Sequence, residues 1–233
     1  MKKIVILGAG ESGKGSAILA RKNSYEVFVS DNGLIDMETK KKFNGLNIDF
    51  EENSHELAKC TDIDFVIKSP GISDDLEIID FYRNNGIKVI SEIEFAFNFS
   101  KSKIIGITGS NGKTTTTTLV HKLISDANIS CSISGNIGNS FSKVCEDSVQ
   151  YSTVELSSFQ LDGIEKFRPH IAILTGISPD HLDRYKNYNA YIEAKFKITK
   201  NQSANDYLIY NSDCDETNKY IKTNNINSIS VSY

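Results

Sequence analysis

The chain has 233 residues, of which 39% are hydrophobic and 24% are charged, and its net charge is −4. This length suits one large domain or two ordinary ones, and the balance is that of a globular protein. The slightly acidic charge argues against general affinity for nucleic acid or anionic membranes, so any phosphate binding must come from local features. No apolar run is long enough to span a membrane or to form a signal peptide. The four cysteines contain no CxxC pair, which predicts reduced thiols in a cytoplasmic protein (Cys60, Cys131, Cys145, Cys214).

The N-terminal segment predicts a nucleotide-binding βαβ unit. A buried strand, Lys3 to Leu7, runs into a GxGxxG match at Gly8 to Gly13 and then into an apolar helix. A second strand, Glu26 to Ser30, ends at Asp31, which lies about 20 residues past the glycines, where a Rossmann fold places its ribose-binding carboxylate. The pattern does not identify the nucleotide. Glycines that serve only tight helix–strand packing are the structural alternative.

A rigid turn follows the next predicted strand. Phe65 to Ile67 leads into Ser69, Pro70, Gly71 and Ile72, at the strand end where open α/β sheets bind ligands. Further predicted elements are a helix over 76–85, a strand over 88–90 and a short helix over 92–97. A fresh β–α series begins at Lys103, which predicts domains at 1–100 and 101–233.

The second domain opens with KIIGITGSNGKTTTTTL, from Lys103 to Leu119. A buried strand, a glycine loop and a helix start form a phosphate-binding arrangement in which Lys113 would reach the terminal phosphates and Thr114 would bind magnesium. The spacing departs from the generic P-loop, whose first glycine would fall at Ile107. A glycine-rich turn without a ligand is the alternative.

Later strands are predicted over 129–134, 152–156, 171–175 and 207–210, with a second glycine turn at 135–138. Glu155 ends its strand beside the phosphate loop, where a magnesium-binding carboxylate belongs. His181 follows a strand on the same edge between two acids, which suggests a metal or nucleotide role, although a lone histidine is usually structural. The stretch from Asn218 to Tyr233 is rich in Asn and Ser with a short closing strand, and no helix is expected to cover the sheet after it.

A predicted helix over 191–200 places Lys195 on its apolar side. One interpretation is a lysine that extends its ammonium group to solvent. The other is a partly buried amine with a lowered pKa, able to react with carbon dioxide and become a carbamate that binds metal. The pattern alone leaves both open.

Together these motifs resemble the Mur ligases of bacterial cell-wall synthesis. The loop over 106–114 is similar to the ATP loop of that family, and GNIG (135–138), ELSSFQL (155–161), DHLDRY (180–185) and the lysine of EAK (193–195) fit the same family. GxGxxG with SPGI (69–72) and SEIE (91–94) is most similar to the branch that adds D-glutamate. The sequence departs at Gly176, where the family usually has Asn.

The resemblance implies a Rossmann-like domain that binds UDP-N-acetylmuramoyl-L-alanine, not NAD, and a P-loop-type domain that binds ATP and two Mg²⁺ ions. ATP would phosphorylate the substrate carboxylate, and the amine of D-glutamate would attack the acyl phosphate. The D-glutamate-binding domain of the family is not recognisable here, so a substrate-binding fragment that does not ligate alone is expected. A cytoplasmic monomer without nucleic-acid or membrane partners is expected.

Site residues carried over from the family fall into three sets. The ATP-binding set is Gly109, Ser110, Asn111, Gly112, Lys113, Thr114 and Thr115. The UDP-substrate set is Ser12, Asp31, Asn32, Ser69, Pro70, Gly71, Ile72, Asn136, Ser157 and Gln160. The catalytic set is Lys113, Glu155, His181 and Lys195, with Thr114 and Glu155 on one Mg²⁺ and His181 and carbamylated Lys195 on the other. An NAD(P)-dependent oxidoreductase and a non-catalytic UDP-sugar-binding protein are the competing interpretations.

Overall fold

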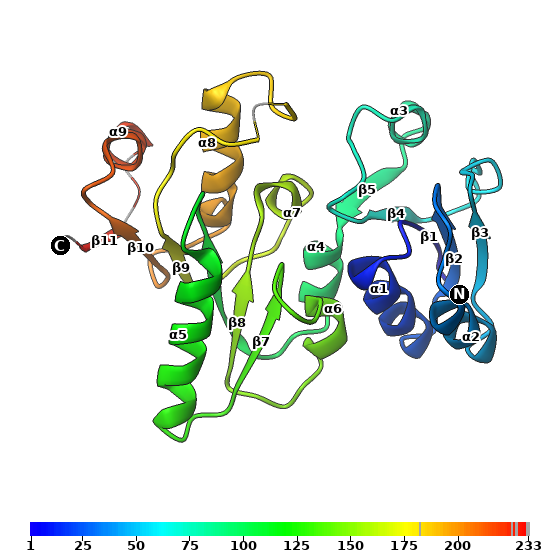
Figure 1. Ribbon diagram of the computed structural model, residues 1–233, viewed down its shortest axis with the longest axis horizontal. Helices are drawn as coiled ribbons and strands as arrows, with labels where there is room; N and C mark the ends of the chain where they lie inside the picture. The colour runs from blue at the N-terminus through cyan, green and yellow to red at the C-terminus, as the bar shows by residue number, and fades with distance from the viewer. Residues whose placement is uncertain (182, 225, 227, 232–233) are drawn as a thin grey trace. The chain divides into compact units, whose positions relative to one another are not determined.

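The computed structural model describes residues 1–181, 183–224, 226 and 228–231. It divides into two compact α/β units, each with its own parallel sheet (Figure 1). The α/β class with parallel sheets is the one that the sequence predicts. The first unit comprises Met1–Phe99 together with two short later segments, Ser140–Lys143 and Gly163–Glu165. The second comprises Ser100–Asn139, Val144–Asp162 and Lys166–Tyr233.

The first unit contains a five-stranded sheet in the order β3-β2-β1-β4-β5, and every pairing in it is parallel. Its strands are β1 (Lys3–Leu7), β2 (Glu26–Asp31), β3 (Asp49–Glu52), β4 (Phe65–Lys68) and β5 (Lys88–Ser91). Its main helices are α1 (Glu11–Lys22), α2 (Met37–Gly45), α3 (Glu77–Asn84) and α4 (Glu92–Phe97). The strand order reverses direction between β1 and β4. Because such crossovers are right-handed, α1 and α3 cover opposite faces, and ligands bind where the order reverses.

The alternation of side chains along β1 fills both faces of the first sheet. Val5 and Leu7 join the core cluster beneath α3, where Ile78, Ile79 and Tyr82 are also buried. The intervening residues of β1, which point to the other face, are equally buried (Ile4 and Ile6). A strand buried on both faces reads as a continuous apolar run, which is why its sequence predicts it well.

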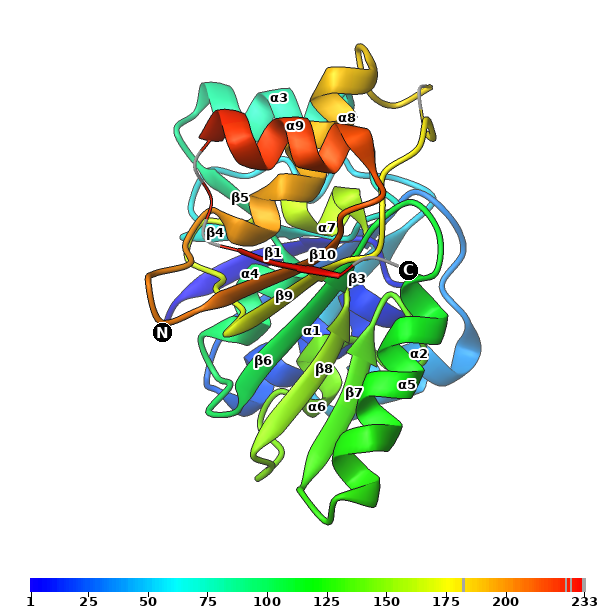
Figure 2. The ribbon, with the colours of Figure 1, turned by 90° about the vertical axis from the view of Figure 1, so that its left-hand side faces the viewer.

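The second unit contains a six-stranded parallel sheet in the order β11-β10-β9-β6-β8-β7. Its strands are β6 (Lys103–Thr108), β7 (Cys131–Gly135), β8 (Tyr151–Glu155), β9 (Ile171–Leu174), β10 (Tyr207–Asn211) and β11 (Ser228–Val231). Its helices are α5 (Lys113–Asp126), α7 (Ser158–Asp162), α8 (Tyr188–Phe196), the 3-10 turn η1 (Lys197–Thr199) and α9 (Asp215–Asn224). The short α6 (Phe141–Val144) lies mostly in the later segment Ser140–Lys143 of the first unit. In Figure 2, α5 runs along β7 and β8, whereas α8 and α9 lie together across the other face.

Several elements differ from the sequence expectations. Helices α2, α6 and α7 and strand β3 were not predicted, and α9 lies in the stretch whose composition suggested only Asn- and Ser-rich chain. Helix α9 forms because Thr217 and Ile221, one turn apart, are buried, and Tyr220 stacks on Phe196 with ring centroids 3.9 Å apart. Helix α8 begins three residues earlier than predicted, because Asn187 caps it by accepting a hydrogen bond from the Ala190 amide. No helix in the described part of the chain has the length and apolar character needed to cross a membrane.

Candidate functional site

The phosphate loop connects β6 to α5, and its glycines are required by its backbone. Gly109 has φ +145° and Gly112 has φ +78°, which are conformations that favour glycine. A Cβ at Gly109 would lie 2.0 Å from Thr175 Oγ1, at the end of the neighbouring strand β9. This contact gives the departure from the generic spacing a structural reason. Because Gly109 has no side chain, the loop can pack directly against the end of β9.

Ser110 anchors the loop to the segment that follows β9. Its amide donates to the Gly176 carbonyl at 2.9 Å, and its hydroxyl donates to the Ser178 carbonyl at 2.9 Å. The same hydroxyl lies 3.0 Å from the hydroxyl of Tyr191 on α8. Gly176 itself has φ +142° with open space where a Cβ would be, so its conformation, not crowding, favours glycine there.

Lys113 begins α5 and folds its side chain back over the loop. Its ammonium donates to the carbonyls of Gly109 at 3.0 Å and Ser110 at 2.9 Å. The N-terminus of α5 adds the partial positive charge of its unpaired amides, with Thr115 exposed in the first turn. A cation and a helix N-terminus thus meet at one loop, as an anion site requires.

Glu155 lies at the carboxyl end of β8, only 1% exposed, and joins two other predicted site residues. Its Oε2 accepts from Thr114 Oγ1 at 2.8 Å, and its Oε1 accepts from Asn136 Nδ2 at 2.9 Å. Asn136, predicted as a UDP-substrate residue, therefore lies beside the predicted magnesium ligands. Hydroxyl, carboxylate and amide oxygens are the ligands that Mg²⁺ prefers, so this group fits that ion.

Lys195 is buried on α8, with 1% of its surface exposed. Its ammonium lies 4.9 Å from the centre of the Tyr191 ring, so it does not extend to solvent as the first interpretation requires. Burial, reinforced by the charge of Lys113, lowers the pKa of Lys195 from 10.5 to about 7. A substantial fraction of this amine is therefore neutral at physiological pH.

His181 is exposed, and its backbone has φ +52°. Its Nε2 lies 3.5 Å from Asp180 Oδ2, and its ring centre is 5.0 Å from that of Phe159. Within residues 1–181, 183–224, 226 and 228–231, no group of three or more His, Cys, Asp and Glu side chains could hold a metal ion. Leu182 of the DHLDRY motif lies outside the described residues.

Ser157 and Gln160 pair with each other at the start of α7. Gln160 Oε1 accepts from the Ser157 amide at 2.9 Å, and Ser157 Oγ accepts from the Gln160 amide at 3.2 Å. This is a capping box, which the S-x-x-Q spacing could have revealed. Gln160 is 1% exposed, so its side chain is committed to the helix start.

The glycine loop of the first unit is closed by Asp31. Its carboxylate accepts from the Ala9 amide at 2.6 Å and from the Gly33 amide at 2.7 Å. A Cβ at Gly13 would lie 1.7 Å from the Gly8 carbonyl oxygen, so α1 can start here only because Gly13 has no side chain. Ser12 is half-buried in the first turn of α1, and Asn32 is exposed beside Asp31.

The Ser69–Ile72 turn lies next to this loop, at the point where the strand order reverses. The Ser69 amide donates to the Leu7 carbonyl, and the Ile72 amide donates to the Ser69 carbonyl, both at 3.0 Å. A Cβ at Gly8 would lie 2.9 Å from Ser69 Oγ, so the two backbones are in close contact. The first unit thus gathers seven of the ten predicted UDP-substrate residues at one sheet edge (Ser12, Asp31, Asn32, Ser69, Pro70, Gly71 and Ile72).

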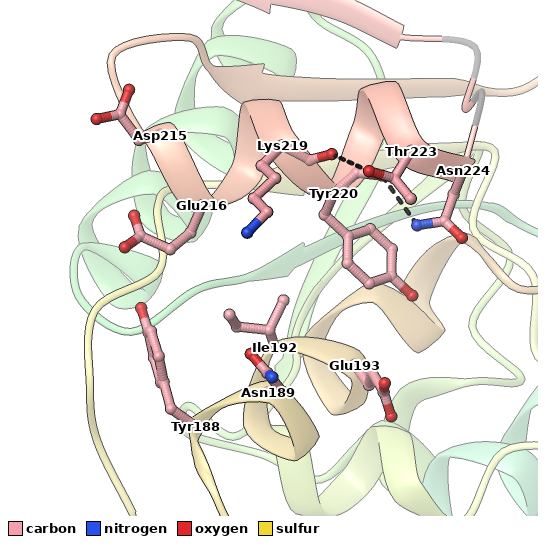
Figure 3. Close-up of a pocket in the computed structure, with 10 residues that line it drawn as sticks. All are labelled: Tyr188, Asn189, Ile192, Glu193, Asp215, Glu216, Lys219, Tyr220, Thr223 and Asn224. Atoms are coloured by element: carbon pink, nitrogen blue, oxygen red, sulfur yellow. Dashed lines mark hydrogen bonds between the residues drawn. The ribbon is translucent and has the colours of Figure 1, made fainter.

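Two hollows of the second unit are relevant to the site. One, of about 390 Å³, continues from the phosphate loop and is lined by Ser110, Asn111, Thr175, Gly176, Ile177, Ser178, Asp213, Cys214, Asp215 and Glu216. The sequence predicted no role for its last four residues, although they follow β10 at the same sheet edge. A larger groove of about 600 Å³ separates α8 from α9, with Tyr188 and Ile192 facing Glu216 and Lys219 (Figure 3). It contains none of the predicted site residues.

Both units match domains of Mur ligases. The model of the Mur ligase middle domain matches residues 107–233, and the model of the MurD N-terminal domain matches residues 3–78. The chain is 52% identical over 229 residues to UDP-N-acetylmuramoylalanine–D-glutamate ligase of Christiangramia forsetii, covering 97% of this chain and 52% of that protein. It is 47% identical over 212 residues to the enzyme of the same name from Bacteroides fragilis, covering 90% and 48%. The chain spans about half the length of the curated relatives it matches.

Solved structures agree on the fold. The UDP-N-acetylmuramate:L-alanyl-gamma-D-glutamyl-meso-diaminopimelate ligase of Neisseria meningitides superposes with a TM-score of 0.68 at 16% identity, covering 99% of this chain and 78% of that one. The UDP-N-acetylmuramate-alanine ligase of Thermotoga maritima gives a TM-score of 0.60 at 22% identity, covering 100% and 53%. At these identities the likeness concerns the fold alone.

Proposed function

Because the chain belongs to the Mur ligase family, we propose that it forms the UDP-substrate- and ATP-binding part of an enzyme that joins D-glutamate to UDP-N-acetylmuramoyl-L-alanine. The main support is the group formed by Thr114, Glu155 and Asn136 next to the phosphate loop. It combines a buried carboxylate with two neutral partners, and it adjoins a lysine and a helix N-terminus. An NAD(P)-dependent oxidoreductase needs no such second site.

In the second unit, the phosphates of ATP bind the amides of the loop over 109–112 and the N-terminus of α5. Lys113 exchanges its two loop carbonyls for oxygens of the terminal phosphate, where its charge stabilises the transfer. The hollow lined by Asp213 and Glu216 continues from the loop and accommodates the nucleoside. Thr114 and Glu155 would hold Mg²⁺, which would supply positive charge to neutralise the phosphates.

Lys195 is proposed to react as its neutral amine with carbon dioxide. A nitrogen–carbon bond forms, one proton is released, and the buried cation becomes a carbamate anion. The low pKa of Lys195 favours this reaction near neutral pH. Together with His181 it would supply oxygen and nitrogen ligands for a second Mg²⁺, as the family resemblance implies.

In the first unit, the UDP-linked substrate binds along the sheet edge formed by the glycine loop, Asp31, Asn32 and the Ser69–Ile72 turn. Ser12 lies in the first turn of α1, whose N-terminus faces the diphosphate. We assign Asn136 to the substrate carboxylate end, next to Glu155. Ser157 and Gln160 act by ordering α7 beside that end.

The reaction proposed has two steps. The substrate carboxylate attacks the terminal phosphorus of ATP, which releases ADP and leaves an acyl phosphate. The amine of D-glutamate then attacks the acyl carbon, loses a proton and expels phosphate, so an amide forms. No residue of this chain is assigned to D-glutamate. ATP and nucleotide-activated sugars are cytoplasmic metabolites, so we propose a cytoplasmic enzyme, acting as a monomer.

Calorimetric titration of the chain tests this function. We expect saturable binding of UDP-N-acetylmuramoyl-L-alanine and no binding of NAD⁺ or NADP⁺ in parallel runs. Binding of a non-hydrolysable ATP analogue should need Mg²⁺ and should be weakened at least about tenfold by Lys113→Ala, which removes a charged phosphate ligand. Lys122→Ala, on an exposed turn of the same helix, is the matched control. Binding of a nicotinamide cofactor instead of the UDP substrate would refute the proposal.

A further inference from the structure

The Ser69–Ile72 turn is held by a lysine whose role the family resemblance does not assign. Lys68 is the last residue of β4, a strand with neighbours on both sides. Its side chain is only 7% exposed, although it carries a charge. Burying an ammonium group is unfavourable unless it is paired and hydrogen-bonded. An apolar residue would occupy this buried position at a lower desolvation cost.

The ammonium of Lys68 has two acceptors, and one of them belongs to the turn. Nζ donates to the Ile72 carbonyl at 2.9 Å and to Asp74 Oδ2 at 3.1 Å. The turn is therefore fixed at both ends. Its first residue is attached to β1 through the Leu7 carbonyl, and its last residue is attached to Lys68.

Asp74 is in turn attached to α3. Its Oδ1 accepts from Arg83 Nη2 at 2.6 Å, and its backbone carbonyl accepts from Arg83 Nη1 at 3.4 Å. Although burial alone would raise the pKa of Asp74, Lys68 and Arg83 lower it overall, which keeps this carboxylate charged. Lys68 thus links the turn to a helix that is itself anchored in the core by Ile78 and Ile79.

We infer that Lys68 is a positioning residue for substrate binding: through the Ile72 carbonyl and Asp74 it holds the Ser69–Ile72 turn against the glycine loop, in the shape that receives the UDP-linked substrate. This inference rests on the proposed function of the first unit. A turn that is already ordered before the substrate arrives binds it more tightly, because the loss of conformational entropy accompanies folding and not binding. Lys68 contacts the turn at the Ile72 carbonyl. Its effect on substrate binding is therefore indirect, through the position of the turn.

The test compares Lys68→Met with wild type by calorimetry, using UDP-N-acetylmuramoyl-L-alanine for the first unit and a Mg²⁺–ATP analogue for the second. We expect the UDP-substrate affinity to fall about tenfold, as for loss of one charge-assisted hydrogen bond, and the ATP-analogue affinity to stay within about twofold. Lys68→Arg keeps a donor for the Ile72 carbonyl and should recover part of the loss. If Lys68→Met does not fold, Asp74→Asn replaces it, with an expected loss of about threefold because one neutral acceptor remains.

Lys59→Met is the matched control. Lys59 also pairs with two acids, one of them Glu77 on the same helix α3, but its partners are exposed and none lies in the turn. Its substitution should leave both affinities unchanged. Unchanged UDP-substrate affinity in a folded Lys68→Met variant would overturn the inference, as would equal losses at both sites or an equal loss in Lys59→Met. Failure of the wild-type chain to bind the UDP substrate would instead refute the proposed function.

Discussion

The buried amine of Lys195 makes a quantitative prediction about stability and pH. In the folded chain its pKa is about 7, against 10.5 for an ordinary lysine. Between these values the unfolded state binds more protons than the folded state, so stability rises with pH by up to about 1.4 kcal/mol per pH unit. From pH 7 to pH 9 this single group should stabilise the second unit by about 2 kcal/mol, and the full shift corresponds to about 5 kcal/mol.

Lys195→Met removes the titration and keeps most of the volume. The variant should be more stable than wild type at pH 7, because no charge is buried, and this advantage should shrink by about 2 kcal/mol at pH 9. Urea unfolding in carbon dioxide-free buffer at pH 7, 8 and 9, followed by circular dichroism, measures the difference. Alkylation of Cys145, which is 1% exposed in the second unit, assigns the transition to that unit. Equal pH dependence in the two proteins would refute the buried-amine reasoning.

Three further predictions concern other positions. Gly13→Ala should destabilise the first unit by at least about 2 kcal/mol in urea unfolding, since its Cβ would meet a backbone carbonyl, whereas Gly10→Ala, with nothing within 4 Å, should be nearly neutral; equal effects would contradict the contact. Burial raises the pKa of Glu92 from 4.5 to about 7; stability is therefore lost as pH rises through this range, and the advantage of Glu92→Gln over wild type should be roughly 2–3 kcal/mol larger at pH 8 than at pH 5, measured by the same method. Glu155→Gln should abolish the Mg²⁺ dependence of ATP-analogue binding in a magnesium titration, whereas Glu165→Gln should not; an unchanged dependence would exclude Glu155 as the ligand.

The elements that the sequence predicts well are those whose signal is local. Apolar runs ending in glycine, such as Lys3–Leu7, are buried on both faces and cannot be mistaken for surface chain. Strand β3 was missed because it reads DFEE. Its Glu51 is nevertheless buried, because the Ser30 hydroxyl and the amides of Leu57 and Ala58 satisfy the carboxylate. Those donors come from other segments, which no pattern within four residues can reveal.

The same distinction applies to the site. The loop glycines, Lys113 and Thr114 follow one another in the chain, so their motif predicts their proximity. The attachment of Ser110 to Ser178 depends on β9 lying next to β6, which the sequence order of the strands conceals. Asn136, which the resemblance implies is a substrate residue, donates its side-chain amide to Glu155, because β7 and β8 end side by side.

The two late segments of the first unit have a consequence for how the chain can be made and cut. Glu92 accepts the Ser142 amide, Glu94 accepts the Glu165 amide, and the Ser91 amide donates to the Gly163 carbonyl. A ribosome that has released only the first 99 residues has therefore not yet supplied these partners. The first unit reaches its final hydrogen bonding only when residue 165 has emerged, after β6 to β8 of the second unit. A protein that ended at Phe99 would leave the buried Glu92 carboxylate without the Ser142 amide as its donor. The smallest version of the first unit that keeps its native hydrogen bonds therefore includes much of the second unit.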